Sequence, residues 1–239
     1  TKNMYTVGPT LPELYGANSP KGNYADMSTY GWEISLAWKD QFRLAGKPFN
    51  YEVKATLADY YSKIDRYNNS TKSLDDYYEG QTVGEIWGYV TEGLFRDQAD
   101  IDSHASQKLI KSSNKKWYPG DVKFKDLNDD HVIDYGKNTL SDHGDTVEKH
   151  GDKKVIGNSL PRYIYSVNLN ADWNGIFFSA FFQGVGKQNW YPSSECIFWG
   201  QYNRPYNNMP KWHEGNYWTE NNPDAYLPRY CGYNNSLKS

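Results

Sequence analysis

Four stretches of the sequence alternate between apolar and polar residues with a period of two. They cover residues 32–39, 49–61, 162–173 and 176–185. In the first, Trp32, Ile34, Leu36 and Trp38 share one face, and Lys39 lies on the other. Because side chains alternate across a β-strand, each stretch predicts a strand with one apolar face and one polar face.

The lengths of these stretches favour strands that cross a lipid bilayer. The four have 8 to 13 residues, close to the ~9–11 that a tilted transmembrane strand needs. Aromatic residues also lie near the ends of the apolar faces, at Trp32 and Trp38 and at Tyr163 and Trp173, as in the aromatic girdles of membrane barrels. A water-soluble sandwich with half-buried sheets is the alternative that this pattern leaves open.

The connections between the stretches are unequal in length. About ten residues (40–49) are expected to join the first two strands, and Asn174-Gly175 predicts a tight hairpin turn between the last two. Roughly a hundred residues separate the second stretch from the third, which is too long for a loop inside a compact domain. Outer-membrane barrels combine short periplasmic turns with long external loops, which predicts that residues 1–30, 62–161 and 187–239 are extracellular.

Four strands cannot close a barrel by themselves. Unpaired strand edges in lipid would leave backbone hydrogen-bonding groups unsatisfied, at several kcal/mol each. On the membrane interpretation, the remaining strands must therefore come from outside these 239 residues.

The composition suits an interface better than a large aliphatic core. The chain has 22 Tyr, 9 Trp and 9 Phe, yet only 38% of its residues are hydrophobic and the mean hydropathy is -0.89. No apolar run approaches the ~20 residues of a membrane-spanning helix, and the first ten residues do not have the apolar core of a signal peptide. A net charge of -3 without a basic stripe argues against nucleic-acid binding. Cys196 and Cys231, the only two cysteines, could form one disulfide or remain two thiols.

An acidic stretch at residues 126–137 follows part of the EF-hand pattern of oxygen ligands. Asp126, Asn128, Asp130, the Val132 carbonyl and Asp134 match its first, third, fifth, seventh and ninth positions. His131 replaces the turn glycine, however, and Lys137 replaces the bidentate glutamate. We therefore expect either a calcium or magnesium site that is weak or is completed from elsewhere, for instance by Asp142 or Asp145, or a turn whose Asp and Asn side chains cap their own backbone. No cofactor is required in either case.

Aromatic residues of the expected external segments form a second set of candidate contacts. Rings beside polar side chains can stack on sugars or anchor a protein partner. The candidates for contact with a substrate or a partner are Trp87, Tyr89, Trp117, Tyr118, Trp190, Trp199, Tyr202, Trp212 and Trp218.

The sequence does not favour an enzyme. Its histidines have no zinc-binding spacing, and neither a Gly-x-Ser-x-Gly elbow nor a phosphate-binding loop is present. Carboxylates such as Glu92 and Glu214 could form a glycosidase pair, but the sequence does not give the separation that such chemistry requires.

Several strings resemble successive segments of the SusC/RagA family, the TonB-dependent outer-membrane transporters of Bacteroidetes. They are "GEIWGYVTEGLFRDQADID" (84–102), "PGDVKFKDLNDDHVID" (119–134), "VIGNSLPRYIYSVNLNADWNGIFFSAFFQGVG" (155–186) and "YWTENNPDAYLPRY" (217–230). Their order and spacing also match, and "NYADMSTYGWEISLAW" (23–38) is similar to an upstream strand of the family. The resemblance covers most of the chain.

The resemblance implies an all-β fold: residues 1–239 would be a portion of the C-terminal half of a 22-stranded antiparallel transmembrane β-barrel with long extracellular loops. The family's plug domain and TonB box are not in this sequence, so contact with TonB would run through that missing N-terminal part. The implied function is uptake of oligosaccharides or peptides across a Gram-negative outer membrane, with a SusD-like surface lipoprotein as partner. A secreted, soluble, glycan-binding β-sandwich remains the alternative.

Overall fold

The computed structural model describes residues 1–7, 16, 20–69, 72–110, 116–136, 144–191 and 210–230. They divide into two compact units. The sheet unit comprises Thr1–Ser70, Tyr77–Glu85 and Gly157–Asn189, and the loop unit comprises Thr71–Asp76, Ile86–Ile156 and Trp190–Ser239.

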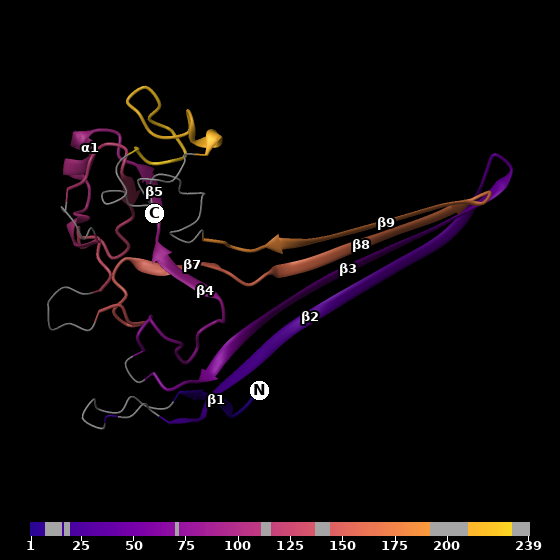
Figure 1. The fold of residues 1–239 in the computed structure, drawn as a ribbon, viewed down its shortest axis with the longest axis horizontal. Coiled ribbons are helices and arrows are strands. Elements are labelled where there is room, and N and C mark those ends of the chain that lie inside the picture. Colours follow the sequence, from indigo (N-terminus) through magenta and orange to yellow (C-terminus); the bar gives the residue numbers. More distant parts are fainter. Residues whose placement is uncertain are drawn as a thin grey trace. The chain divides into compact units, whose positions relative to one another are not determined.

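The sheet unit is a five-stranded antiparallel sheet of order β1-β2-β3-β8-β9 (Figure 1). Its strands are β1 (Met4–Val7), β2 (Lys21–Leu44), β3 (Lys47–Arg66), β8 (Arg162–Trp173) and β9 (Ile176–Lys187). The short strand β1 pairs with residues 21–25 of β2, and β2 then pairs with β3 from Asp26 to Leu44. The expectation of an all-β fold is confirmed: the described residues contain only one α-helix, of six residues, besides short 3-10 turns.

Both hairpins of the sheet close with two-residue turns. Ala45 and Gly46 have φ of 48° and 76°, and Asn174 and Gly175 have φ of 49° and 84°. Two successive positive φ angles are those of a type I′ turn, whose twist matches the flanking strands. The predicted turn at Asn174-Gly175 is therefore confirmed. The predicted ten-residue connection at 40–49 is wrong, because β2 continues to Leu44 and β3 begins at Lys47.

The strands keep the predicted alternation but extend beyond it. β2 has 24 residues and β3 has 20, whereas the alternation covers residues 32–39 and 49–61. Pairing holds these added residues: residues 21–25 of β2 pair with β1, and the added residues from Asp26 onward pair with β3. β9 keeps the predicted alternation, with Ile176, Phe178, Ala180 and Phe182 on one face; Phe177 and Phe181 lie on the second face together with Ser179 and Gln183, so both faces of this strand carry rings.

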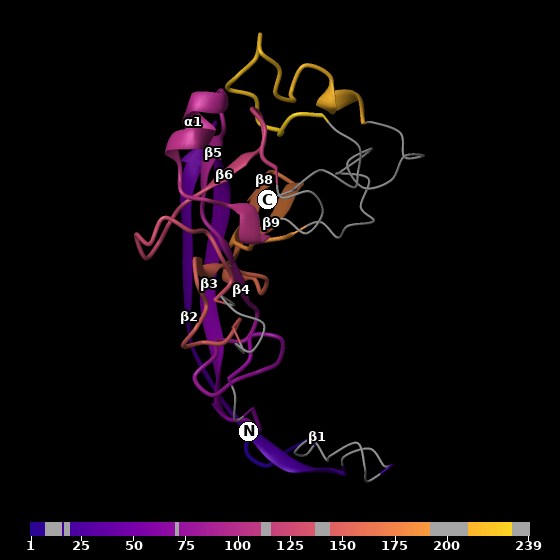
Figure 2. The same cartoon turned by 90° about the vertical axis from the view of Figure 1, so that its left-hand side faces the viewer.

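The loop unit contains short helices and strands (Figure 2). Its buried apolar side chains form a small core. Its strand pairs are β4 (Glu85–Tyr89) with β7 (Lys153–Asn158) and β5 (Thr91–Leu94) with β6 (Val122–Phe124). Helix α1 (Gln98–Ser103) is capped by Asp97, whose side chain accepts the Asp100 amide. Two 3-10 turns, η2 (Lys108–Ile110) and η4 (Lys211–His213), complete the unit. In the part of the chain that the structure describes, no helix is long and apolar enough to cross a membrane.

A glycine of β9 makes room for a tyrosine ring of β8. A Cβ atom at Gly184 would lie 2.4 Å from the Tyr165 hydroxyl oxygen and 2.5 Å from its Cζ. Gly184 thus allows the Tyr165 ring to lie across the neighbouring strand, a packing device known for sheets. A Cβ atom at Gly186 would lie 3.0 Å from the Tyr163 Cβ.

We expect Gly184→Ala to lower the stability of the sheet by about 1–3 kcal/mol, because the new methyl group must displace the Tyr165 ring. The measurement is the thermal unfolding of the purified full-length protein. Truncating the ring in Gly184→Ala/Tyr165→Ala should remove the clash. The Gly184→Ala change should therefore lower the stability less in the Tyr165→Ala background than in the wild type. An equal cost in both backgrounds would contradict this packing.

Candidate functional site

The first candidate surface is the apolar face of the sheet. Cross-strand partners place Trp38, Val53, Leu169 and Ala180 in one row and Leu36, Ala55, Val167 and Phe182 in the next. None of these side chains is buried: Leu36, Trp38, Val53 and Phe182 are exposed, with 69% for Leu36 and 57% for Phe182, and the other four are half-buried. Large apolar side chains in contiguous exposed rows mark a surface that contacts another apolar phase or a partner.

Aromatic residues border this face in two rows. Tyr30 and Tyr61 stack with ring centroids 5.6 Å apart, beside Trp32. At the hairpin ends, Phe42 and Phe49 lie 4.9 Å apart, and the Trp173 indole donates to the Leu44 carbonyl. The second border thus lies at Phe42, beyond the Trp38 that the sequence suggested, because β2 is longer than its alternation.

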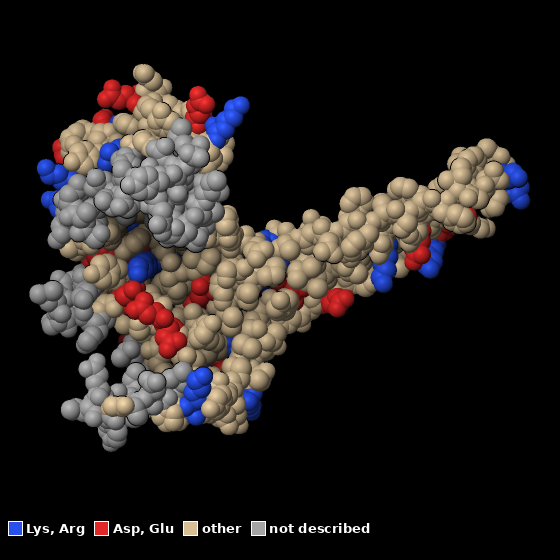
Figure 3. Space-filling view, in the orientation of Figure 1, with Lys and Arg blue, Asp and Glu red and all other residues tan. Residues whose placement is uncertain are grey.

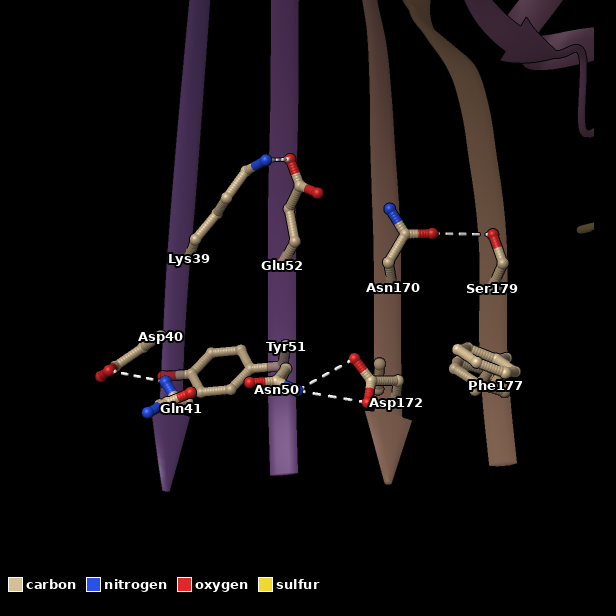
Figure 4. A pocket seen from close by; sticks show the side chains of 12 residues that line it. Lys39, Asp40, Gln41, Asn50, Tyr51, Glu52, Asn170, Asp172, Phe177 and Ser179 are labelled. Carbon is tan, nitrogen blue, oxygen red and sulfur yellow. Dashed lines mark hydrogen bonds and ion pairs between the residues drawn. The ribbon is translucent and has the colours of Figure 1, made fainter. Parts of the chain in front are cut away.

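The opposite face of the sheet is a ladder of polar rungs (Figure 4). Lys39 pairs with Glu52 at 3.2 Å, and the Asn50 amide donates to both Asp172 carboxylate oxygens. Further rungs join Asn170 to Ser179 at 2.8 Å and Thr56 to Ser166 at 2.6 Å. Lys54 and Asn168 are direct cross-strand partners on this same face.

Near the hairpin ends, this ladder borders a groove lined by Lys39, Gln41, Asn50, Glu52, Asn170 and Asp172, among other residues. Phe177 lies beside Asp172 on the polar face and is 80% exposed. In Figure 3, charged side chains follow one border of the sheet, while the rest of its visible surface is uncharged. The sheet is therefore a wall with two chemically different sides.

The loop unit uses several of the candidate aromatic residues for its own packing. Trp117 is only 8% exposed and belongs to the core with Phe95, Val122, Phe124 and Ile133. Its indole donates to the Gln107 carbonyl at 3.0 Å. The ring centroids of Tyr89 and Phe124 lie 5.3 Å apart, and those of Trp87 and His150 lie 5.4 Å apart. Trp117 thus has almost no surface left for a ligand.

Residues 216–230 dock on the turn at 118–121. Trp218 lies over Gly120, where a Cβ atom would come within 2.5 Å of the indole. Arg229 binds Asp121 at 2.6 Å, and its guanidinium lies 4.7 Å from the centre of the Tyr118 ring. The Arg229 amide also donates to the Gly120 carbonyl. Trp218 therefore helps to hold residues 216–230 against the turn at 118–121.

Three of the candidate aromatic residues remain substantially exposed: Tyr118 at 40%, Trp190 at 72% and Trp212 at 40%. Among the candidates that the structure describes, these three have the most exposed rings, and contact with a substrate or partner stays a prediction. Trp199, Tyr202, Cys196 and Cys231 lie outside the described residues.

The acidic stretch forms a turn whose side chains cap their own backbone. Asp126 accepts the amides of Asn128, Asp129 and His131, the last at 2.8 Å. Asn128 accepts the Asp130 amide, and Asp130 accepts the Val132 amide. His131 has φ of 64°, the left-handed conformation expected for the position where an EF-hand has glycine. The self-capping turn predicted as one alternative is confirmed.

A buried carboxylate that sequence reasoning missed completes this turn. Asp152 is fully buried and accepts the amides of Leu127 at 2.8 Å and Asp134 at 2.9 Å. Burial raises the pKa of the Asp152 carboxyl, and the charges of Asp126 and Asp130 act in the same direction. Because the folded pKa is raised, this group favours folding most at low pH, and the contribution is lost as pH rises through that pKa. No local signal marks Asp152, because its partners lie 18 and 25 residues away.

Metal binding at this turn stays a prediction. Within the described ranges, no three His, Cys, Asp or Glu side chains are grouped so that they could hold a metal ion. Asp134 is 3% exposed and accepts the Gly136 amide, while Asp145 pairs with Lys153 at 2.6 Å. Lys137 and Asp142 lie outside the described residues.

We expect Asp126→Ala to loosen the turn, because three backbone amides lose their acceptor, at a local cost of about 1–3 kcal/mol. Hydrogen exchange over residues 126–134 in the full-length protein measures the effect. Glu92→Ala is the matched control, since it removes the same charge from an exposed strand position. Equal exchange in both variants would contradict the capping role of Asp126.

The calcium prediction has its own readout. If the turn binds calcium, millimolar calcium should slow exchange over residues 126–134 in the wild type and have no effect in Asp126→Ala. Unchanged exchange in the wild type on addition of calcium would show that the turn does not bind calcium.

Comparisons with known proteins agree with the geometry. No family model matches the chain. The TonB-dependent receptor P39 of Formosa agariphila is 23% identical over 216 residues, covering 75% of this chain and 18% of the receptor. The structure of the RagAB peptide transporter matches 92% of this chain and 22% of its own, with a TM-score of 0.55 and 17% identity.

The chain spans about a fifth of the length of these relatives. One comparison rests on sequence and the other on fold, and each covers most of the 239 residues. Together they confirm the resemblance found in the sequence: this chain is similar to one part of a TonB-dependent receptor of the SusC/RagA kind.

Proposed function

We propose that the chain is part of the barrel wall of a TonB-dependent transporter that takes up nutrients across a bacterial outer membrane. The observation that carries the proposal is the exposed apolar face of β2, β3, β8 and β9, bordered by two aromatic rows. Exposed rows of this kind need an apolar phase, and the polar rungs of the other face need water or polar protein.

The spacing of the aromatic rows supports a membrane location. Phe42 lies ten residues after Trp32 on β2. At ~3.3 Å per residue and a tilt of ~35–45°, the rows are about 25 Å apart along the barrel axis, the height of the apolar band of outer-membrane barrels. In this arrangement, Leu169 contacts lipid, whereas Lys54, Asn168 and Asn170 face the lumen.

The substrate in this proposal is a peptide, and an oligosaccharide is the second candidate. The similarity in fold to the RagAB peptide transporter supports a peptide as the substrate. Tyr118, Trp190 and Trp212 would contact the substrate or a SusD-like surface lipoprotein, because aromatic residues are enriched at interface hot spots. Energy coupling would come from TonB through parts of the protein beyond this sequence.

The soluble sandwich is the weaker alternative. A sandwich buries one face of each sheet against another sheet, and among the described strands no second sheet covers the apolar face of β2, β3, β8 and β9. Nothing in the described geometry specifically favours a secreted glycan-binding domain.

Leu169→Arg should impair barrel assembly, because an arginine on the lipid-facing side near the membrane centre costs ~2–4 kcal/mol. The measurement is the amount of folded full-length protein in the outer membrane, read from its heat-modifiable migration in gels.

Asn170→Arg is the matched control, since the neighbouring residue of the same strand carries the same new charge on the polar face beside Glu52. It should assemble at close to wild-type levels. Normal assembly of Leu169→Arg, or equal impairment of both variants, would contradict the assignment of the two faces.

A further inference from the structure

The β3 strand changes its neighbour within a few residues. Its ladder with β8 ends where Ala58 pairs with Ile164. From Ser62 onward the same edge is bonded to residues 80–83: the Val83 amide donates to the Ser62 carbonyl at 2.9 Å, and the Ile64 amide donates to the Gln81 carbonyl at 3.0 Å. The three residues 59–61 lie between the two partners.

An ion pair occupies this gap. Asp59 is 6% exposed and accepts Nε and Nη2 of Arg162, both at 2.6 Å. The Arg162 guanidinium lies 5.8 Å from the centre of the Tyr61 ring and 5.6 Å from that of Tyr163. A bidentate pair between rings is strong and directional, and removing one partner leaves a poorly solvated charge.

The same carboxylate ends the ladder. Tyr163 immediately precedes Ile164, the last residue of β8 that pairs with β3, and its amide donates to the Asp59 side chain at 3.3 Å. Tyr163 has φ of 56°, a conformation that is unfavourable for a bulky residue and persists only where its surroundings hold it. Asp59 therefore turns β8 away from β3 through both Arg162 and Tyr163.

The segment that precedes Arg162 is bonded to the segment that takes over the edge of β3. The Ser159 amide donates to the Gly84 carbonyl at 2.7 Å, and the Asn158 side chain donates to the Val83 carbonyl at 3.1 Å. A Cβ atom at Gly84 would lie 2.7 Å from Leu160 and from Asn158. Residues 80–84 and 157–161 are thus packed as one piece, through which the chain leaves the sheet unit and returns to it.

We propose that Asp59 and Arg162 form a latch that stops the β3–β8 ladder at Ile164 and fixes the root of the long loop, residues 80–84 and 157–161. When the latch opens, Tyr163 returns to extended backbone and the ladder continues toward Tyr60. That extension draws residues 157–161 along β3 and releases the root, while the ladder below Ile164 stays intact. The latch thus makes loop movement possible without unfolding the wall.

Hydrogen exchange of the full-length transporter in detergent tests the latch. In Asp59→Asn, which cannot hold the guanidinium with two charged oxygens, exchange over 80–84 and 157–161 should accelerate at least tenfold. Exchange over 49–57 and 165–172 should stay at the wild-type rate. Arg162→Lys, which keeps the charge but loses the bidentate geometry, should give an intermediate rate at the root.

Asp26→Asn is the matched control. It breaks the second bidentate pair of the same sheet, in which Arg66 binds Asp26 at 2.9 and 3.1 Å. This variant should leave exchange over 157–163 unchanged. The charge swap Asp59→Arg/Arg162→Asp should restore much of the protection at the root.

Unchanged exchange at the root in both Asp59→Asn and Arg162→Lys would overturn the proposal. So would acceleration that spreads equally over 165–172, because the pair would then only stabilise the whole sheet. If Asp59→Asn does not assemble, the ratio of root exchange to ladder exchange in Arg162→Lys decides between these outcomes.

Discussion

The register of four antiparallel strands determines which chemistry each side of this sheet presents. Side chains alternate with a period of two, so a slip of one residue would exchange the apolar and polar faces completely. The type I′ turns at Ala45-Gly46 and Asn174-Gly175 fix the register inside each hairpin. Rungs such as Asn50–Asp172 and Thr56–Ser166 fix it between the hairpins. The membrane-facing surface and the polar lumen of the proposed transporter both depend on these few contacts.

The loop unit is ordered by different forces. Its apolar core is small, so buried polar side chains carry much of its organisation. Gln107 illustrates this, since its side chain accepts the Phe124 amide and donates to the Val122 carbonyl while its own carbonyl accepts the Trp117 indole. Asp152 and Asp126 do the same for the acidic turn. A loop built in this way is defined in shape without a large core, which would suit the external surface of the proposed transporter.

Local patterns in the sequence predicted four strands of the sheet but not their full lengths. Strands β8 and β9 begin at Arg162 and Ile176, where the alternation begins. The ends of β2, by contrast, do not keep a continuous apolar face, and pairing with β1 at residues 21–25 and with β3 from Asp26 onward makes them strands. The self-capping of Asp126 was predictable, because Asx turns involve near neighbours. The roles of Asp152, Arg229 and the Asp59–Arg162 pair were not, since their partners lie 18 to 108 residues away. Likewise, the sequence cannot tell a core tryptophan such as Trp117 from an exposed one such as Trp190.

If β8 is part of a barrel wall, its alternate residues face lipid and a polar lumen. A nitroxide scan along residues 165–171 of β8, in the full-length protein reconstituted into liposomes, tests this. Accessibility to oxygen, which dissolves in lipid, should peak at Tyr165, Val167, Leu169 and Ala171. At Ser166, Asn168 and Asn170 the nitroxide should instead be accessible to a water-soluble nickel chelate or buried against protein. Accessibilities without a period of two, or with the two sets of residues exchanged, would rule out this orientation of the strand.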